Sequence, residues 1–439
     1  MKLFISYLGQ LTNVAVGILM LPLILFFLNT QEFLLWSLFT AIGGLLLQVE
    51  TAIQSILVRD IAKNANYDSN NFLHSISFAK KSYRLFAILA FLFLILVGIP
   101  YFYISKIDIS ASSWLLCWIV FSATYFFNFL FGPNNCTLIA TQNTTKFNVN
   151  NMGGRLINLA LVAALLAMGY GFYALIAGFA VSVAFGCSLN ARAARASRLQ
   201  VSESISADVG DETMSGPRLS EIIRFSLFLG LSYWLYRLLL LANAASSGDH
   251  AANASFALAL QLFAIFMTLA LTPLQMRVAP LISALKRNDR DEAALEFCRL
   301  QLLVNGVIIF STMMFLVAIP FIGNFVAIDI EWPSFGIVLA LSFAFLIETN
   351  LQAIANLFIS ERDYRFVVPY CFSAMIAIFA GVIMTISAFS IETSIFVMSL
   401  IQLMVALPNF IRLLTKTINL DISIYRVVLN QSVAKTLRR

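Results

Sequence analysis

Long apolar runs recur along the whole of this 439-residue chain, and they limit its fold more than any other feature. Hydrophobic residues make up 60% of the sequence and charged residues 11%, against about 25% charged residues in soluble proteins. A helix of about 20 apolar residues crosses the hydrocarbon core of a bilayer. We therefore expect an all-α polytopic membrane protein in which most of the chain is membrane domain.

We predict twelve membrane-spanning helices, an even number that places both termini on the same side of the membrane. The first run is too long for the core of a signal peptide and lacks a small-residue cleavage site, so it should be retained as a helix. The predicted helices cover residues 4–28, 33–57, 84–104, 113–139, 151–169, 171–190, 222–246, 251–275, 300–322, 334–358, 365–388 and 392–414.

The basic residues give the expected orientation. With the N-terminus in the cytoplasm, every lysine and arginine except Lys106 and Arg237 falls in an inner loop, at an inner helix end or in the C-terminal tail. This distribution follows the positive-inside rule, so both termini should be cytoplasmic. The formal charge of +6 therefore reports orientation and gives no support to nucleic-acid binding.

A polar, serine-rich stretch at 192–220 divides the predicted helices into six and six. Its composition is typical of a flexible linker, here on the cytoplasmic side. It separates an N-terminal six-helix lobe, 1–191, from a C-terminal six-helix lobe, 221–415. The cytoplasmic tail, 416–439, is either a short amphipathic helix on the inner leaflet or a loose tail.

The second lobe resembles the first at a nearly constant distance along the chain. Three matches lie 220, 218 and 219 residues apart: LVGIPY at 96–101 with LVAIPF at 316–321, Arg59 with Arg277, and Lys146-Phe147 with Arg365-Phe366. Their agreement predicts a duplicated six-helix unit. Since six is even, the copies cross the membrane in the same sense, which gives a parallel repeat with a central cleft between two lobes.

Polar side chains at helical spacing mark the faces that we expect to line this cleft. A lipid-facing helix has no use for amide groups, so such stripes should face inward. The candidate cleft residues on these faces are Gln10, Asn13, Asn128, Gln261, Thr268, Gln352 and Asn356. Hydrogen bonding between helices is the alternative role for these residues.

Arg237 is the one charged residue near the middle of the predicted helix 222–246. It follows Phe225 by twelve residues, about 18 Å of helical rise, and an arginine at that depth costs about 2.5 to 3.5 kcal/mol on insertion scales. Tyr233 lies on the same helix face. Because a guanidinium matches phosphate oxygens, Arg237 is a candidate to bind an anionic group in the cleft.

The alternative is that Arg237 pairs with Glu50 or Glu348 and holds the lobes together, and both roles can coexist. The two glutamates have two possible roles of their own. Each is either a protonatable or cation-binding group of an ion-coupled transporter or a hydrogen-bonding group between helices.

The sequence contains no signature of an enzyme. His74 and His250 are isolated, and there is neither a Walker-type loop nor a spacing of metal ligands. The five cysteines lie within or beside apolar runs and are expected to be small core residues. We therefore expect no cofactor, no metal and no catalysis, and ATP hydrolysis within this chain is excluded.

Two segments carry a resemblance to a known family: TQNTTKFNVNNMGGRLINLAL at 141–161 and AMGYGFYALIAGFAVS at 167–182. They resemble the polar turn between helices 4 and 5 and the glycine-rich turn between helices 5 and 6 of the O-antigen and polysaccharide flippases. These proteins form a branch of the multidrug/oligosaccharidyl-lipid/polysaccharide (MOP) exporter superfamily. The resemblance extends to the helix number, the short outer loops and the chain length.

The resemblance implies a transporter of the bacterial inner membrane that works by alternating access. Its substrate would be an oligosaccharide repeat unit linked to undecaprenyl pyrophosphate, moved from the cytoplasmic to the outer leaflet for O-antigen, capsule or exopolysaccharide assembly. Membrane lipids are implied partners, with protons or sodium ions as candidate coupling ions. A polysaccharide polymerase or a chain-length regulator is a candidate protein partner.

Other functions remain open. Drug exporters of the superfamily (MATE transporters) commonly carry an acid inside the first helix, whereas 4–28 contains Gln10 and Asn13 and no acid. Lipid II flippases usually have fourteen helices and arginines in the first, which differs from this chain. A membrane glycosyltransferase or an O-antigen polymerase usually needs a sizeable periplasmic segment, and the longest outer loop expected here is 323–333.

Overall fold

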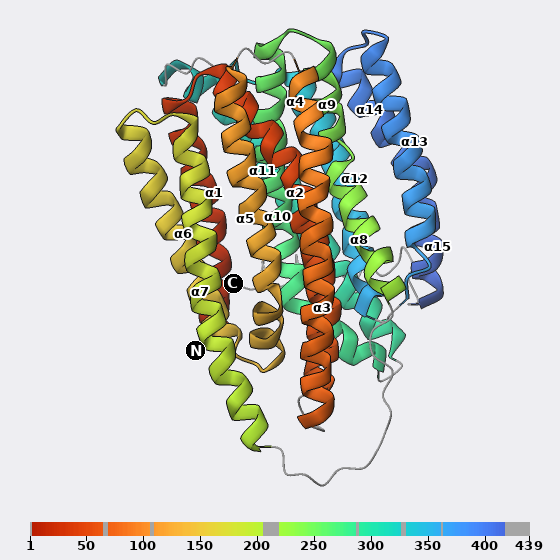
Figure 1. Ribbon diagram of the computed structural model, residues 1–439. Helices are drawn as coiled ribbons and strands as arrows, with labels where there is room; N and C mark the ends of the chain where they lie inside the picture. The colour runs from red at the N-terminus through yellow and green to blue at the C-terminus, as the bar shows by residue number, and fades with distance from the viewer. Residues whose placement is uncertain are drawn as a thin grey trace. The chain divides into compact units, whose positions relative to one another are not determined.

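The computed structural model describes residues 2–64, 69–105, 109–204, 219–286, 289–325, 331–360 and 363–417 (Figure 1). All regular elements in these ranges are helices, which confirms the expected all-α class.

Each of the twelve predicted helices corresponds to one helix or to a run of adjoining helices. The first six are α1 (Lys2–Phe27), α2 (Thr30–Asn64), the run α3 (Ser69–Phe93), η1 (Leu94–Gly98) and α4 (Ile99–Ile104), α5 (Ala111–Ala140), α6 (Thr144–Ala167) and α7 (Phe172–Ser204). The last six are the pair α8 (Leu219–Trp234) and α9 (Arg237–Ser246), α10 (His250–Lys286), α11 (Arg290–Phe325), α12 (Phe335–Ser360), α13 (Val367–Ile386), and the run α14 (Ile391–Ile401), η2 (Gln402–Ala406) and α15 (Leu407–Thr417).

Among the described residues, ten helices are long and apolar enough to cross a membrane. The pair α8 and α9 makes an eleventh if it is one span, bent by 53° at its break. Ala15–Phe27 of α1 is a shorter apolar helix. The chain is thus a polytopic helical membrane protein, and the count of twelve crossings stays a prediction.

Several helices continue beyond the predicted spans, which corrects the expected linker. Residues 192–204 of the predicted linker 192–220 are the last part of α7, and residues 219 and 220 begin α8. These residues are rich in alanine and arginine, which favour helix but carry no signal of membrane insertion. Residues 205–218 and all but the first two residues of the predicted tail 416–439 lie outside the described residues.

The chain forms two compact units, whose boundary differs from the predicted 191/221. Unit 1 comprises Met1–Trp234, Asn243–Ala254 and Ile328–Glu331, and unit 2 comprises Leu235–Ala242, Ser255–Ala327 and Trp332–Arg439. The helix α8 packs along α2 and therefore belongs to unit 1. Within unit 1, α6 and α7 run side by side, with α1 against α6 (Figure 1).

The core of unit 1 is aromatic and centres on Phe39, which is 0% exposed. Its ring centroid lies 4.7 to 5.5 Å from those of four rings on three other helices: Phe102, Trp118, Phe121 and Phe172. Trp118 also donates its indole N–H to the carbonyl of Leu94 at 3.0 Å, where the π-helix η1 interrupts the α-helical hydrogen-bond pattern.

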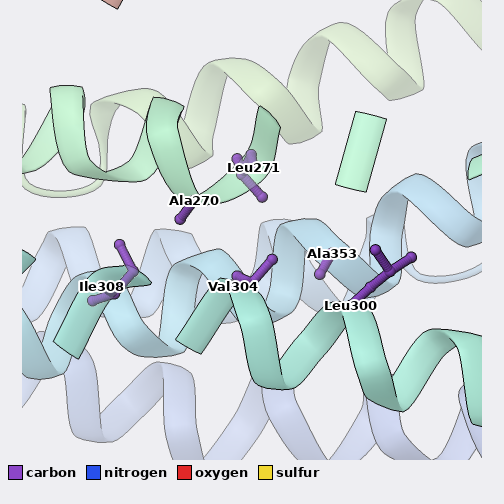
Figure 2. Packing of buried hydrophobic residues seen from close by; sticks show 6 residues of the cluster. All are labelled: Ala270, Leu271, Leu300, Val304, Ile308 and Ala353. Carbon is purple, nitrogen blue, oxygen red and sulfur yellow. The ribbon is translucent and has the colours of Figure 1, made fainter. Parts of the chain in front are cut away.

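The core of unit 2 contains an aliphatic seam between three helices, shown in Figure 2. Leu300, Val304 and Ile308 follow one another at intervals of four along α11, so they share one helix face. They pack with Ala270 and Leu271 of α10 and with Ala353 of α12.

Two turns repeat the same backbone geometry in the two units. The amides of Met168, Gly169 and Tyr170 donate to the carbonyls of Ala164, Leu166 and Leu165, and those of Ser387, Ala388 and Phe389 donate to Ile383, Thr385 and Met384. Every donor and acceptor of the second turn lies 219 residues after its counterpart. The middle residue has a positive φ in both, +83° at Gly169 and +59° at Ala388. This match supports the predicted duplication.

These two positions make a reciprocal test of the turn. A left-handed φ is strained for any residue with a Cβ, and a Cβ at Gly169 would meet no atom within 4 Å. We expect Gly169→Ala to lower the free energy of unfolding and Ala388→Gly to raise it, each by about 0.5 to 1 kcal/mol. Thermal unfolding of the two variants in the same detergent measures this, and shifts of equal sign would contradict it.

Candidate functional site

Glu50 and Asn128, two of the predicted residues, meet inside unit 1. The Nδ2 of Asn128 on α5 donates to the Oε2 of Glu50 on α2 at 2.6 Å, and the Glu50 side chain is buried. The thiol of Cys187 on α7 donates to the Oδ1 of Asn128 at 3.9 Å. A buried carboxylate is costly unless it is hydrogen-bonded, so Asn128 gives Glu50 the partner that it needs.

An amide network holds α5, α6 and α7 together. Asn190 on α7 is 2% exposed and donates to the Oδ1 atoms of Asn135 at 3.0 Å and Asn151 at 3.3 Å. Its own Oδ1 accepts a hydrogen bond from Asn150 at 2.9 Å. These four side chains hydrogen-bond to one another between helices, which is the alternative role given above for polar stripes.

Unit 2 contains a buried polar cluster around Glu348. Tyr370 on α13 donates its hydroxyl to the Oε1 of Glu348 on α12 at 2.8 Å. One turn further along α13, Ser373 donates to the Oε1 of Gln402 at 3.0 Å. Tyr236 and Ser399 share a hydrogen bond at 3.2 Å, and Tyr236 interacts electrostatically with Glu348. We call these six residues, each 3% exposed or less, the unit 2 polar cluster.

The two buried acids do not occupy equivalent positions of the repeat. The turns after α5 and α12 share a backbone hydrogen bond, from Asn143 to Leu138 and from Asp363 to Phe358, and these residues are 220 apart. At that distance Glu348 corresponds to Asn128, not to Glu50. Each unit therefore brings its own acid and its own hydrogen-bond donor to the core.

The Tyr233 side chain, predicted to face the cleft, makes a hydrogen bond within unit 1. Its hydroxyl donates to the carbonyl of Thr40 on α2 at 2.8 Å, and Trp234 donates its indole N–H to the carbonyl of Ala41 at 3.0 Å. The Tyr233 hydroxyl fills the space where Gly44 has no Cβ. A small residue here lets the two helices approach closely.

The other predicted residues lie on three helices. Arg237 is the first residue of α9 and is half-buried. On α10, Gln261 is half-buried, while Thr268 is exposed and donates to the carbonyl of Ala264 at 2.8 Å. Gln352 and Asn356 are half-buried on α12, four residues apart. The side chains of Gln10 and Asn13 lie outside the described residues, and the pairing of Arg237 with either acid stays a prediction.

The unit 2 polar cluster contains residues that the sequence reasoning missed. Tyr370 and Ser373 stand three residues apart in α13, and Ser399 and Gln402 stand three residues apart in the run formed by α14 and η2. This helical spacing was the available signal.

Arg155 was expected at an inner helix end but lies halfway along the 24-residue α6, within electrostatic range of Tyr125.

Gly44, which leaves space for the Tyr233 hydroxyl, can be tested with a matched pair of variants. Gly44→Ala would place a Cβ on the Tyr233 hydroxyl and should destabilise the protein by about 1 to 3 kcal/mol, the usual range for overpacking. Gly306→Ala on α11 meets no atom within 4 Å and should stabilise by up to about 1 kcal/mol through helix propensity. Thermal unfolding distinguishes the two, and equal effects would contradict this account.

The bond between Tyr370 and Glu348 can be tested with a second tyrosine as the control. Tyr370→Phe removes the donor to a buried carboxylate and should cost about 1 to 3 kcal/mol. Tyr364 is 7% exposed and its hydroxyl has no hydrogen-bond partner in the described structure. Tyr364→Phe should therefore leave the melting temperature unchanged or raise it. If Tyr364→Phe lowered the stability of the protein as much as Tyr370→Phe does, the assignment would be contradicted.

The described residues contain no group of three or more histidine, cysteine or acidic side chains that could hold a metal ion. No protein-family model matches the chain, and no curated protein matches its sequence.

Solved structures match over nearly the whole length. An inward-facing multidrug resistance MATE family transporter of the MOP superfamily has a TM-score of 0.61 and 13% identity, with 95% of this chain and 98% of that chain covered. A MATE protein in the bent conformation has a TM-score of 0.59 and 11% identity, covering 97% and 95%. An outward-facing MATE family transporter of the MOP superfamily has a TM-score of 0.55 and 11% identity, covering 95% and 94%. This chain thus has the fold of the MATE transporters of the MOP superfamily.

Proposed function

We propose that this protein is a membrane flippase that works by alternating access. Its substrate would be a sugar repeat unit linked to undecaprenyl pyrophosphate, moved from the inner to the outer leaflet of a bacterial inner membrane. The fold supports a transporter, since its solved neighbours are described as multidrug transporters. The duplicated turns support two related units, which alternating access uses.

The observation that carries the choice of substrate is the place of Arg237. Together, α8 and α9 are long and apolar enough to cross a membrane once, and we take them as one broken span. Arg237 is the first residue of α9, next to the break. The first turn of a helix carries partial positive charge from its free N–H groups, and in discontinuous transmembrane helices such ends face anionic substrate groups. Arg237 adds a full positive charge at the same place.

This electrostatic environment favours an anionic headgroup over a cationic drug. A guanidinium forms paired hydrogen bonds with phosphate oxygens, which gives a pyrophosphate a contact that a neutral or cationic molecule lacks. The first helix, α1, contains no aspartate or glutamate, the feature common in the drug exporters.

Further parts of the proposal concern the cleft and coupling. Gln10, Asn13, Gln261, Thr268, Gln352 and Asn356 would contact the sugars. Glu50 or Glu348 would couple transport to protons or sodium ions, each from a buried and hydrogen-bonded position. A polysaccharide polymerase or chain-length regulator would take over the flipped units, and both termini would be cytoplasmic. A MATE-type drug exporter is the alternative, and an O-antigen polymerase or membrane glycosyltransferase is a more distant one.

Deletion of the gene in the parent organism tests the proposal against these alternatives. We expect the surface glycan to be lost and lipid-linked repeat units to accumulate on the cytoplasmic side. A normal glycan with increased drug sensitivity would favour the drug exporter. Single repeat units that reach the outer surface without being polymerised would favour the polymerase.

The role of Arg237 has its own test in the complemented strain. Arg237→Ala should reduce export about tenfold or more, because charge-assisted hydrogen bonds of about 1.5 to 3 kcal/mol are lost. Arg237→Lys keeps the charge without the paired donors and should retain an intermediate rate. Arg224→Ala removes an exposed arginine from α8 and should leave export unchanged. Full export by well-inserted Arg237→Ala would leave this arginine a structural role only.

A further inference from the structure

The exposed face of α3 changes from basic to apolar along the helix. Lys80, Lys81 and Arg84 are exposed in its first part. In the part that follows, the large exposed side chains are aliphatic and recur at helical spacing: Leu85, Ile88, Leu89 and Leu92. An apolar helix face of a membrane protein contacts lipid chains, and basic residues beside it are placed to meet the lipid headgroups.

The apolar part of the run α3, η1 and α4 has the length of the hydrocarbon core of a bilayer. It contains no charged residue from Leu85 to Ile104. These two residues are separated by about 28 Å of helical rise, and the hydrocarbon core is about 30 Å thick. Tyr103, at the far end, is 64% exposed, and tyrosine is common at a membrane interface. Arg84 and the two lysines before it therefore lie at headgroup level.

The opposite face of α3 is packed on α5, which fixes the direction of the three cations. Tyr83 is 0% exposed, and its hydroxyl accepts a hydrogen bond from the thiol of Cys136 on α5 at 3.5 Å. Its ring lies where a Cβ of Gly132 would be. Ala79 and Ala87 are also 0% exposed. The cations are thus held on the outer side of a packed helix rather than in a loop.

The three cations are not neutralised by acids. The helix α3 contains no aspartate or glutamate, and within the described residues none of the three forms an ion pair. Lys80 and Lys81 lie four and three residues before Arg84, so their like charges repel on one helix surface. An anionic group bound between them would offset this repulsion and gain charge-assisted hydrogen bonds.

The helix α11 of unit 2 has the corresponding place in the predicted repeat, since LVAIPF near its end matches LVGIPY near the end of the α3 run. Its first turns differ in charge. Asp291 and Glu292 are exposed in the first turn, and Glu296 forms an ion pair with Arg299. An anionic headgroup would meet acids and a neutralised arginine at α11, but uncompensated cations at α3.

We propose that Lys80, Lys81 and Arg84, which we call the α3 basic patch, bind the phosphate headgroup of an anionic phospholipid such as phosphatidylglycerol. The acyl chains would lie along the apolar part of the same helix face. Lysine and arginine donate hydrogen bonds to phosphate oxygens. The patch continues directly into the lipid-facing stripe, which favours a phospholipid over a soluble phosphate. This proposal concerns a lipid site and holds whichever substrate the protein carries.

Native mass spectrometry of the full-length protein in detergent tests the proposal. The protein is titrated with phosphatidylglycerol or with phosphatidylcholine of the same acyl chains, and the dissociation constant of the first bound lipid is measured. We expect phosphatidylglycerol to bind about tenfold or more tightly than phosphatidylcholine. The variant Lys80→Gln/Lys81→Gln/Arg84→Gln should lose this preference. Equal affinity of the unaltered protein for both lipids, or a preference kept by the triple variant, would overturn the proposal.

Three paired arginines provide a control with the same change in formal charge. Arg59, Arg299 and Arg365 each form an ion pair with an acid. The variant Arg59→Gln/Arg299→Gln/Arg365→Gln removes three positive charges and should keep the preference for phosphatidylglycerol. If it lost the preference as completely as the α3 variant, lipid binding would follow net charge and the assignment to α3 would be wrong.

Undecaprenyl pyrophosphate is a further probe, because its headgroup offers the same phosphate chemistry. If the α3 basic patch bound it more tightly than phosphatidylglycerol, the patch would be an entrance for a substrate and the choice of a phospholipid would be wrong. The single variant Arg84→Gln should lose part of the preference, and it repeats the test if the triple variant melts at a lower temperature. Since the readout is lipid binding, a failure here is distinct from a failure of the flippase proposal.

Discussion

The structure depends on keeping every backbone polar group hydrogen-bonded where no water is available. Helices meet this requirement internally, so each interruption within a span needs help from elsewhere. Trp118 donates to a carbonyl of the π-helix η1, which is such an interruption. Tyr233 and Trp234 donate to carbonyls of the continuous helix α2 and so tie α8 to it. These three aromatic side chains therefore link neighbouring helices, each through an apolar ring and one hydrogen-bond donor.

The helices themselves were predictable because hydropathy reports what lies in lipid, and each predicted helix has a counterpart in the structure. The helix ends were harder to predict, since α3 begins at Ser69 and α7 continues to Ser204 through polar sequence. A helix outside the bilayer is held by propensity and packing, which leave no apolar signature. The assignment of α8 to unit 1 escaped prediction for a related reason, because contact with α2 decides it and the position of the linker does not.

The sequence predicted some of the polar residues of the site, but it did not predict which of them hydrogen-bond to each other. Spacing singled out Glu50 and Asn128 separately, and only the packing of α2 on α5 shows that they bond to each other. Tyr370 and Gln402 were missed because one pair of polar residues three apart is a weak periodic signal. Whether a polar residue faces a cleft or another helix is a property of its neighbours.

Under the predicted duplication, Gly169 and Ala388 are corresponding residues of the two halves. Both copies retain the left-handed backbone, although only one retains the residue that adopts it without strain. The buried acids differ more under the same correspondence, since Glu348 is matched with an asparagine of the first half. On this prediction, a duplicated scaffold fixes the backbone path of both halves and leaves the polar groups of each core free to differ.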